Sequence, residues 1–289
     1  MKLNLARFRV TSPRKFKLSD YSCSNTGRVK SKEQAEKILE ANIKEMAELQ
    51  DKMYAHDKWA VLLIFQAMDA AGKDGAIKHV MSGLNPQGTQ VFSFKQPSAE
   101  ELDHDYLWRI NKSLPERGRI GIFNRSHYEE ILVVKVHDLV EKEKLPHELI
   151  HNRIWEDRYR QFRDYERYLY ENGIVTVKFF LHLSKDEQKR RFLKRIEDPT
   201  KNWKFSESDL KERKFWDEYQ KTYEEAITNT ASKYGPWYII PADKKWFARL
   251  VISQVIVETM RKLKPVYPTP SEEHIANLQV YKERLLNEE

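Results

Sequence analysis

A short segment near residue 70 combines small residues, a lysine and two aspartates at a spacing that suits phosphate chemistry. Residues 67–74 read Ala-Met-Asp-Ala-Ala-Gly-Lys-Asp, which is close to the G-x-x-x-x-G-K-[ST] pattern of phosphate-binding loops. Small residues at Ala70, Ala71 and Gly72 let backbone N–H groups surround phosphate oxygens, and a helix beginning near Lys73 directs its positive dipole end at the same anion. Lys73 adds a full positive charge that can follow a phosphoryl group during transfer.

Two positions of this loop depart from the pattern, and a third places an acid inside it. Ala67 replaces the first glycine, Asp74 replaces the usual serine or threonine, and Asp69 lies among the loop residues. Because an acid among phosphates is unfavourable unless a cation lies between them, we expect Asp69 to hold Mg²⁺ (with Mn²⁺ as the alternative ion), to accept a proton, or both. An ordinary turn of small residues is the alternative; the apolar strand before the loop, the spacing and the extra acids favour a phosphate site.

A second group of polar residues follows the apolar run at residues 119–123. The chain continues there as Asn124-Arg-Ser-His-Tyr-Glu-Glu, and ligands of doubly wound sheets bind at the carboxyl ends of strands. Arg125 is therefore expected to point into the same crevice as Lys73 and to hold two phosphate oxygens, unless it pairs with a surface carboxylate. Asn124 could orient a phosphate or a metal-bound water. We interpret His127, a lone histidine at a helix start, as a surface or capping residue.

A third group is a strongly basic segment. Residues 185–204 hold eight lysines and arginines against four acids. Arg191 and Arg195 are four residues apart and share one helix face. Two helices joined by a charged break at Glu197-Asp-Pro199 predict a lid, at about 185–215, that closes over phosphates. A solvated helix face is the alternative; it is a serious rival for three lysines, Lys185, Lys189 and Lys194, and a weaker one for the arginines.

Five short apolar runs supply the strands that would position these groups. The runs are Trp59–Phe65, Thr89–Phe94, Arg119–Phe123, Ile174–Leu183 and Trp237–Ile240. Helical patterns lie between and after them, at 74–82, 99–113, 126–136, 147–171, 185–196, 207–230 and 243–262. Ser98 with Glu101, and Ser184 with Glu187, form capping-box pairs at two helix starts. Alternating strands and helices predict an α/β fold with a parallel sheet that helices cover on both faces.

The chain divides into three parts. Residues 1–57 form an N-terminal extension, in which 1–30 wrap over the surface and 32–55 form an amphipathic helix that Ser31 and Gln34 cap. Residues 58–263 form the main domain with its lid. Residues 264–289 hold a proline-stiffened linker and a last helix at 272–287, which we expect to pack on the domain or on a partner subunit.

Composition limits the class of protein. The 289 residues are 40% hydrophobic, and they contain neither an apolar run of about 18 residues nor a secretory signal, so we expect no membrane association. The single cysteine, Cys23, excludes an intrachain disulfide framework and fits a cytoplasmic protein. The net charge of +7 indicates a polyanionic partner if the charge is clustered.

Four motifs in order give the chain a resemblance to a known family. Asp-Ala-Ala-Gly-Lys-Asp at 69–74, Asp-Tyr-Leu-Trp-Arg at 105–109, Phe-Asn-Arg-Ser-His-Tyr-Glu-Glu at 123–130 and Glu-Asp-Pro-Thr-Lys-Asn-Trp-Lys-Phe-Ser at 197–206 resemble the family-2 polyphosphate kinases, over residues 15–265. The resemblance implies a P-loop three-layer α/β/α sandwich like thymidylate kinase, with a five-stranded parallel sheet and a helical lid. It implies reversible, Mg²⁺-dependent transfer of phosphoryl groups between polyphosphate and AMP or ADP.

The resemblance also assigns roles to residues. Asp69, Lys73 and Arg125 would be catalytic, and Asp69 would hold the metal. The residues that would bind phosphate or polyphosphate are Ala70, Ala71, Gly72, Asp74, Arg190, Arg191, Arg195, Lys201 and Lys204. Arg109, Asn124 and Glu129 would bind the nucleotide, and Glu129 would set the choice of acceptor because the glutamate form resembles the subgroup that acts on both AMP and ADP.

Two other functions compete with this one. An ATP-dependent nucleoside monophosphate kinase could use the same fold, and a nucleic-acid-binding module could use the basic segment, although no nucleic-acid motif occurs and we expect no nucleic-acid partner. The expected partners are polyphosphate and adenine nucleotides, with guanine nucleotides as a further option. We expect a homo-oligomer, either a dimer or a tetramer.

Overall fold

Five parallel strands form the centre of one sheet in the computed structural model, which describes residues 3–12 and 16–287. The strands are β2 (Ala60–Ala67), β3 (Thr89–Ser93), β4 (Ile120–Asn124), β5 (Ile174–His182) and β6 (Trp237–Pro241). Each lies within two residues of a run that the sequence predicted. Parts of the N-terminal extension and of the C-terminal segment, residues 1–2, 13–15 and 288–289, lie outside the described residues.

The predicted count of five strands is wrong by one. A short strand, β1 (Arg9–Val10), pairs antiparallel with β6, so the described residues form a sheet of six strands in the order β1-β6-β5-β2-β4-β3. The segment that we expected to wrap over the surface thus joins the sheet edge, where Ile239 N–H donates to Phe8 C=O at 2.8 Å. A two-residue strand is too short to produce the alternating pattern by which strands are identified in a sequence.

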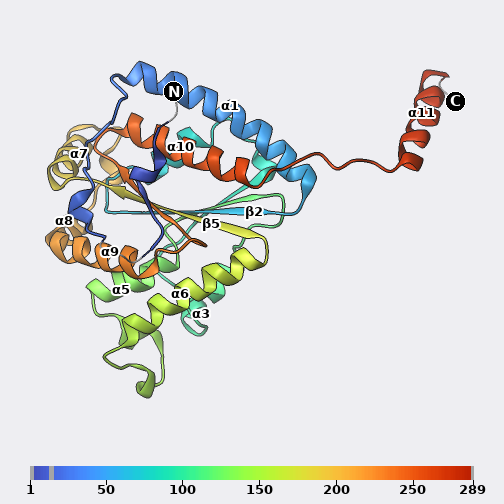
Figure 1. Ribbon diagram of the computed structural model, residues 1–289. Helices are drawn as coiled ribbons and strands as arrows, with labels where there is room; N and C mark the ends of the chain where they lie inside the picture. The colour runs from blue at the N-terminus through green and yellow to red at the C-terminus, as the bar shows by residue number, and fades with distance from the viewer. Residues whose placement is uncertain (1–2, 13–15, 288–289) are drawn as a thin grey trace.

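Helices cover both faces of the sheet (Figure 1). On one face lie α1 (Lys32–His56), α2 (Lys73–Val80) and α10 (Lys245–Lys262). On the other lie α6 (Ile154–Glu171) and α9 (Trp216–Thr230). Side chains of β2 alternate between the two cores, with Leu63 in the first and Leu62 in the second, as the two-residue period of a strand requires. All eight residues of β2 are buried, which explains why seven of them are apolar.

Several predicted helices are shorter or divided in the structure. The prediction at 99–113 becomes α3 (Ala99–Leu102) and α4 (Trp108–Asn111), because the carboxylate of Asp105 accepts from Leu107 N–H and makes a turn between them. The prediction at 126–136 becomes the 3₁₀ helix η4 (His127–Ile131) and α5 (Val133–Val136), and that at 207–230 becomes α8 (Glu207–Lys214) and α9. Helix α7 (Lys185–Glu197) agrees with its prediction. The other 3₁₀ helices are Leu5–Arg7, Leu18–Asp20, Pro86–Gly88, Val140–Glu143, His147–Leu149 and Asn202–Lys204.

The predicted helix caps are formed to different extents. Ser98 and Glu101 make both hydrogen bonds of a capping box at α3. Ser184 accepts from the N–H of Glu187 at α7, but the Glu187 carboxylate turns to Arg190 and Arg191 instead of returning to the cap. That carboxylate therefore links the first turn of α7 to two arginines of the basic segment.

The last helix, α11 (Glu272–Asn287), stands away from the rest of the molecule (Figure 1). All of its described side chains are exposed, including Leu285 and Leu286, so the expected packing on the domain is not found. Packing on a partner subunit stays a prediction. Among the described residues, none of the helices combines the length and apolar character that crossing a membrane requires.

Candidate active site

The loop between β2 and α2 holds two residues in an uncommon backbone conformation. Ala70 and Gly72 lie in the left-handed region, with φ of 61° and 101°, which a glycine adopts freely and an alanine does not. In the described part of the chain, the backbone N–H groups of residues 72–75 have no hydrogen-bond acceptor. Donors without partners at a helix N-terminus form a ready site for an anion.

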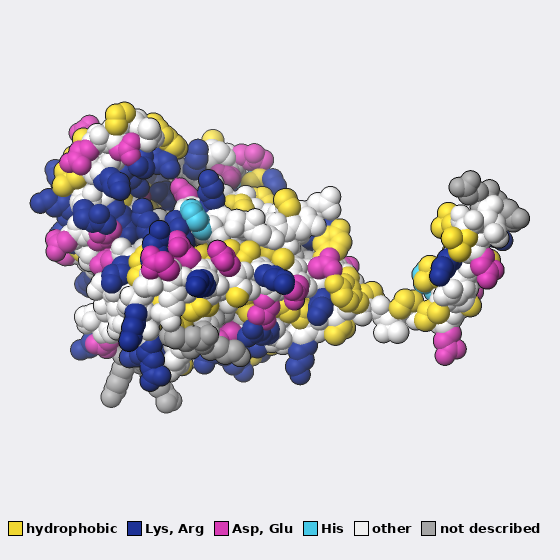
Figure 2. All heavy atoms as spheres, turned by 90° about the horizontal axis from the view of Figure 1, so that it is seen from above, with side chains coloured by type: hydrophobic (Ala, Val, Ile, Leu, Met, Phe, Trp, Pro, Cys, Tyr) yellow, Lys and Arg dark blue, Asp and Glu magenta, His cyan; other side chains and the backbone are white. Residues whose placement is uncertain are grey.

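This loop borders a cavity of about 700 Å³ at the carboxyl ends of the strands. Ten lysines and arginines line it, against three aspartates. The cations are Lys73, Lys95, Arg125, Arg191, Lys194, Arg195, Lys201, Lys204, Lys245 and Arg249; the acids are Asp69, Asp74 and Asp209. Figure 2 shows lysine and arginine side chains gathered around a hollow at one end of the molecule. The positive charge is therefore clustered, and such a cavity attracts a polyanion.

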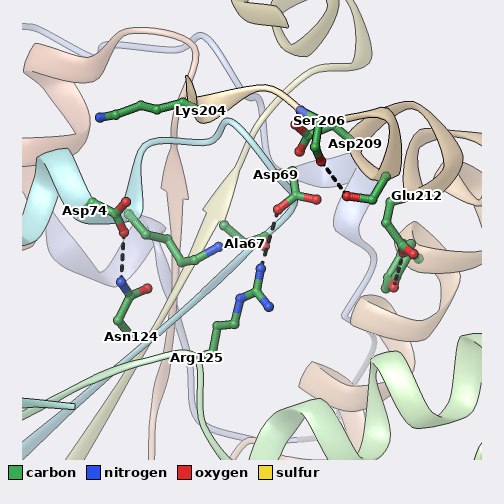
Figure 3. Close-up of polar contacts among 12 residues, drawn as sticks. Ala67, Asp69, Asp74, Asn124, Arg125, Lys204, Ser206, Asp209 and Glu212 are labelled. Carbon is green, nitrogen blue, oxygen red and sulfur yellow. Dashed lines mark hydrogen bonds and ion pairs between the residues drawn. The ribbon is translucent and has the colours of Figure 1, made fainter. Parts of the chain in front are cut away.

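Asp69, Lys73 and Arg125 meet on one side of this cavity. The Arg125 guanidinium points toward the Asp69 carboxylate, 3.7 Å away (Figure 3), and Lys73 Nζ donates to the Ala67 carbonyl at 3.1 Å. Burial lowers the pKa of Lys73, although Asp69 opposes this effect. Burial also lowers the pKa of Arg125, but the carboxylates of Glu129 and Asp69 outweigh it, so the pKa is raised overall. The three predicted catalytic residues are thus brought together.

Asp74 and Asn124 lie beside each other in the same cavity. The Asn124 amide donates to the Asp74 carboxylate at 2.8 Å, which joins the start of α2 to the end of β4 (Figure 3). Both residues line the cavity, as predicted. Their assignments to phosphate and to nucleotide stay predictions.

The carboxylates of the cavity suit a metal that arrives with phosphate. Among the residues that the structure describes, no group of three His, Cys, Asp or Glu side chains could hold a metal ion. Mg²⁺ is often bound by one or two carboxylates together with substrate phosphates and water. Asp69 faces the cavity, about two-thirds buried and opposite Arg125. One carboxylate among many phosphate-attracting cations fits this mode.

The basic segment contributes four predicted residues to the cavity: Arg191, Arg195, Lys201 and Lys204. Arg195 donates to the Lys204 carbonyl at 3.2 Å and lies 4.0 Å from Asp209, which ties α7 to the chain after it. Sequence reasoning missed Asp209. Ser206 and Asp209 form a capping box at the start of α8, a spacing that the sequence displays.

Three predicted site residues do not line the cavity. Arg190 is exposed and pairs with Glu187. Arg109 is buried, where it donates to the Lys95 carbonyl at 2.9 Å and lies 3.6 Å from Glu130. Glu129 is partly buried near Arg125 and Lys73; burial raises its pKa, against the effect of both cations. Substrate contact by these three residues stays a prediction.

The interpretation of His127 as a surface or capping residue is wrong. Its side chain is buried and packs against the rings of Phe162 and Tyr165. Burial lowers its pKa to about 3, so the ring is neutral. Ser126 caps the 3₁₀ helix instead, since its hydroxyl accepts from Tyr128 N–H.

Sequence reasoning did not assign four cations to the site: Lys95, Lys194, Lys245 and Arg249. A solvated face was the rival interpretation for Lys194, and the structure instead places this lysine in the cavity lining. Lys95 follows β3 and Lys245 follows β6, so applying the strand-end rule to every strand would have identified both. Arg249 lies one helical turn after Lys245 on α10.

Comparisons with known proteins show which family the chain is similar to. Residues 29–267 match the family model described as Polyphosphate kinase 2 (PPK2). The chain is 51% identical over 288 residues to an ADP-polyphosphate phosphotransferase of Rhodopseudomonas palustris, with 99% of this chain and 100% of the relative covered. It is 42% identical over 267 residues to an AMP/ADP-polyphosphate phosphotransferase of Meiothermus ruber, with 92% and 96% covered.

A solved structure has the same fold. The crystal structure of polyphosphate kinase 2 from Arthrobacter aurescens TC1 superposes with a TM-score of 0.86 at 36% identity, covering 96% of this chain and 98% of that one. The family match extends over the phosphate loop, the strand-end arginine and the basic segment, and the two relatives are matched over almost their whole length. The chain therefore belongs to the polyphosphate kinase 2 family.

Proposed function

We propose that this protein transfers phosphoryl groups reversibly between inorganic polyphosphate and adenine nucleotides. The observation that carries the proposal is the cavity, in which ten cationic side chains surround a loop with unpaired N–H groups. A chain of condensed phosphates carries a negative charge at every unit. Its binding site therefore needs cations along an extended path, whereas a single phosphate needs them at one point. The relatives' names supply the donor and the acceptors.

The loop is the proposed binding site of the phosphoryl group in transfer, and we infer a thymidylate-kinase-like arrangement of sheet and lid around it. The N–H groups at the start of α2 and the Lys73 ammonium would neutralise the oxygens of this group. Arg125 would approach it from β4. Arg195, Lys201 and Lys204 would hold the polyphosphate chain from the side of the basic segment.

The chemical step is an in-line substitution at phosphorus. An oxygen of the nucleotide's terminal phosphate attacks the terminal phosphorus of polyphosphate, and the bond from that phosphorus to the bridging oxygen breaks. The shortened polyphosphate leaves with the electron pair. Because the attacking oxygen is already anionic near neutral pH, the reaction needs no strong base, and positioning Mg²⁺ is the better role for Asp69.

Mg²⁺ held by Asp69 would neutralise charge on the phosphate oxygens. Asp69 is suited to this task because its carboxylate is paired only loosely with Arg125, at 3.7 Å. Asp74 is engaged with Asn124 and serves less readily as a ligand. Mn²⁺ has the same preference for oxygen ligands and is the alternative ion.

We propose that the acceptors are both AMP and ADP. One relative is named for ADP alone and another for both nucleotides, so the names leave the acceptor range open. The cavity would accommodate either acceptor if polyphosphate lies toward α7 and the nucleotide enters beside β3 and β4. Glu129, next to Arg125, is the proposed determinant of the choice.

The test is nucleotide formation from polyphosphate in the absence of ATP. The purified protein is incubated with polyphosphate and either AMP or ADP, with Mg²⁺ or with EDTA, and the products are separated by ion-exchange chromatography. We expect ADP from AMP and ATP from ADP, only with the metal. Parallel reactions contain ATP and AMP without polyphosphate.

Turnover with ATP and AMP but none with polyphosphate would overturn the proposal in favour of a nucleoside monophosphate kinase. Product formed in EDTA would remove Mg²⁺ from the proposal while leaving the donor intact.

A further inference from the structure

Arg191 lines the cavity, but its donors point into the protein. The Nε atom donates to Glu187 at 2.6 Å. One terminal nitrogen donates to the carbonyls of Ala70 and Ala71, at 2.9 and 2.8 Å, and the other to those of Ala242 and Asp243, at 2.6 and 3.1 Å. A guanidinium has five N–H groups, and all five are engaged. Arg191 therefore has no donor left for a phosphate.

A second residue of α7 also binds a backbone carbonyl of the loop. Gln188, three residues before Arg191 and also buried, donates from its amide to the Asp69 carbonyl at 3.0 Å. Gln188 and Arg191 together hold the carbonyls of three consecutive loop residues, 69–71. Residues three apart lie on one face of a helix, so this face of α7 forms a scaffold for the loop.

The scaffold stabilises a backbone that the sequence alone does not favour. Ala70 has a φ of 61°, and a non-glycine residue in this region needs support from its surroundings. Because Arg191 and Gln188 bind the carbonyls, the loop is fixed in the conformation whose next N–H groups, at residues 72–75, remain unpaired beside the cavity. The loop is thus organised for an anion before any anion binds.

The same contacts connect the loop to the rest of the cavity. Arg191 holds residues 242–243, which lead into the α10 helix that carries Lys245 and Arg249. Arg213 of α8 donates to the Gln188 side chain at 2.6 Å. The α7 face therefore contacts the loop, the segment that leads into α10, and α8.

We propose that Arg191, assisted by Gln188, is a positioning residue for the phosphate loop and not a ligand of polyphosphate. This inference rests on the proposed function and replaces the phosphate-binding role that the sequence predicted for Arg191. Arg195, one turn later on the same helix, contacts the Lys204 carbonyl and retains donors for phosphate, so it provides the direct comparison.

The test distinguishes a cation that binds polyphosphate from a residue that positions the phosphate loop. Binding of long-chain polyphosphate is measured by calorimetry at several NaCl concentrations, and kcat is measured with the same polyphosphate and ADP. Each cation that contacts a polyanion adds close to one unit to the slope of log K against log salt. The variants are Arg191→Met, Arg191→Lys, Gln188→Met and Arg195→Ala. Lys189→Ala is the matched control, because it removes an exposed charge of α7 outside the cavity.

We expect Arg195→Ala to lower the salt slope by about one and Lys189→Ala to change neither slope nor kcat. Arg191→Met should keep the wild-type slope but lower kcat at least about tenfold, and Arg191→Lys should not restore kcat, because one ammonium cannot reach four carbonyls. Gln188→Met, which removes no charge, should lower kcat in the same direction.

Hydrogen exchange of the free proteins provides a second readout. Amides of residues 69–76 should exchange faster in Arg191→Met and Gln188→Met than in the wild type, and should be unaffected in Arg195→Ala. A salt slope reduced by one in Arg191→Met, or kcat restored by Arg191→Lys, would overturn the proposal. Either result leaves the function intact, since wild-type turnover of polyphosphate tests that separately.

Discussion

The Asp69 carboxylate and the Arg125 guanidinium lie 3.7 Å apart at the edge of the cavity, one on the phosphate loop and the other just after β4. Both side chains are partly exposed, and ion pairs in contact with solvent contribute little to stability, typically below about 1 kcal/mol. The pair is therefore easily separated when a metal attracts the carboxylate and a phosphate attracts the guanidinium. Asp69 and Arg125 are therefore placed to release each other when the metal and the phosphate bind.

Asp69→Asn should lower turnover at least about 100-fold, because the amide has the same shape but cannot carry the negative charge that attracts a metal. The fold should remain intact, since the lost ion pair is loose and partly exposed. The rate of ATP formation from ADP and polyphosphate, with the melting temperature, checks both parts. Asp186→Asn on exposed α7 surface is the control and should retain the wild-type rate. A near-normal rate for Asp69→Asn would refute its assignment.

Glu129→Asn should shift the acceptor preference from AMP toward ADP. The substitution removes a negative charge near Arg125 and Lys73, so the site becomes more positive and favours the acceptor with more phosphate. A change of about 1 kcal/mol in this interaction corresponds to about fivefold in the ratio of kcat/KM values. The kcat/KM values for AMP and for ADP are measured with polyphosphate in excess. Glu116→Asn, at an exposed position, is the control. An unchanged ratio would remove Glu129 from the specificity argument.

The sequence predicted the parallel strands and the loop because both have local causes. A strand buried on both faces, such as β2, must be almost wholly apolar, and a loop that binds phosphate must consist of small residues and lead into a helix. The role of Arg191 had no such signal. Apart from Glu187, its partners are the backbone carbonyls of Ala70, Ala71, Ala242 and Asp243, and every residue type carries a carbonyl. Sequence reasoning identified the cation but not what it binds.

Glu130 should make stability depend on pH between about 4.5 and 7. Burial, and then the charge of Glu143, raise its pKa to about 7, against the effects of Arg109 and Arg158. In this window the folded protein keeps the proton that the unfolded chain has released, so the free energy of unfolding falls as pH rises, by at most about 1.4 kcal/mol per pH unit. Above pH 7 this contribution is constant.

Glu130→Gln removes the titrating carboxyl, so the variant lacks this loss of stability. Urea denaturation at pH 5, 6, 7 and 8 should show that the free energy of unfolding of the variant rises relative to that of the wild type up to pH 7, and that the difference is constant above pH 7. Curves that run parallel for the two proteins across the window would contradict the raised pKa.

Lys178 and Glu166 form a fully buried ion pair, and removing one partner should cost more than removing both. Lys178 Nζ donates to Glu166 at 2.7 Å, to the Tyr128 hydroxyl at 2.8 Å and to the Thr230 carbonyl at 3.0 Å. Lys178→Met leaves the Glu166 carboxyl buried without its cation, which should lower the free energy of unfolding by about 3–5 kcal/mol. Lys178→Met combined with Glu166→Leu should recover most of this loss, because the double variant buries no unpaired charge.

Urea denaturation at pH 7 of the wild type, both single variants and the double variant forms a complete cycle. Additive losses would mean that the two groups act independently and that their 2.7 Å contact contributes no coupling. Non-additive losses with an active double variant would have a further consequence. Tyr128 lies three residues after Arg125 and donates to Glu166 at 2.7 Å, so the buried pair contacts the segment that carries the strand-end arginine. Activity in the double variant would mean that this segment needs a well-packed core and not a buried ion pair.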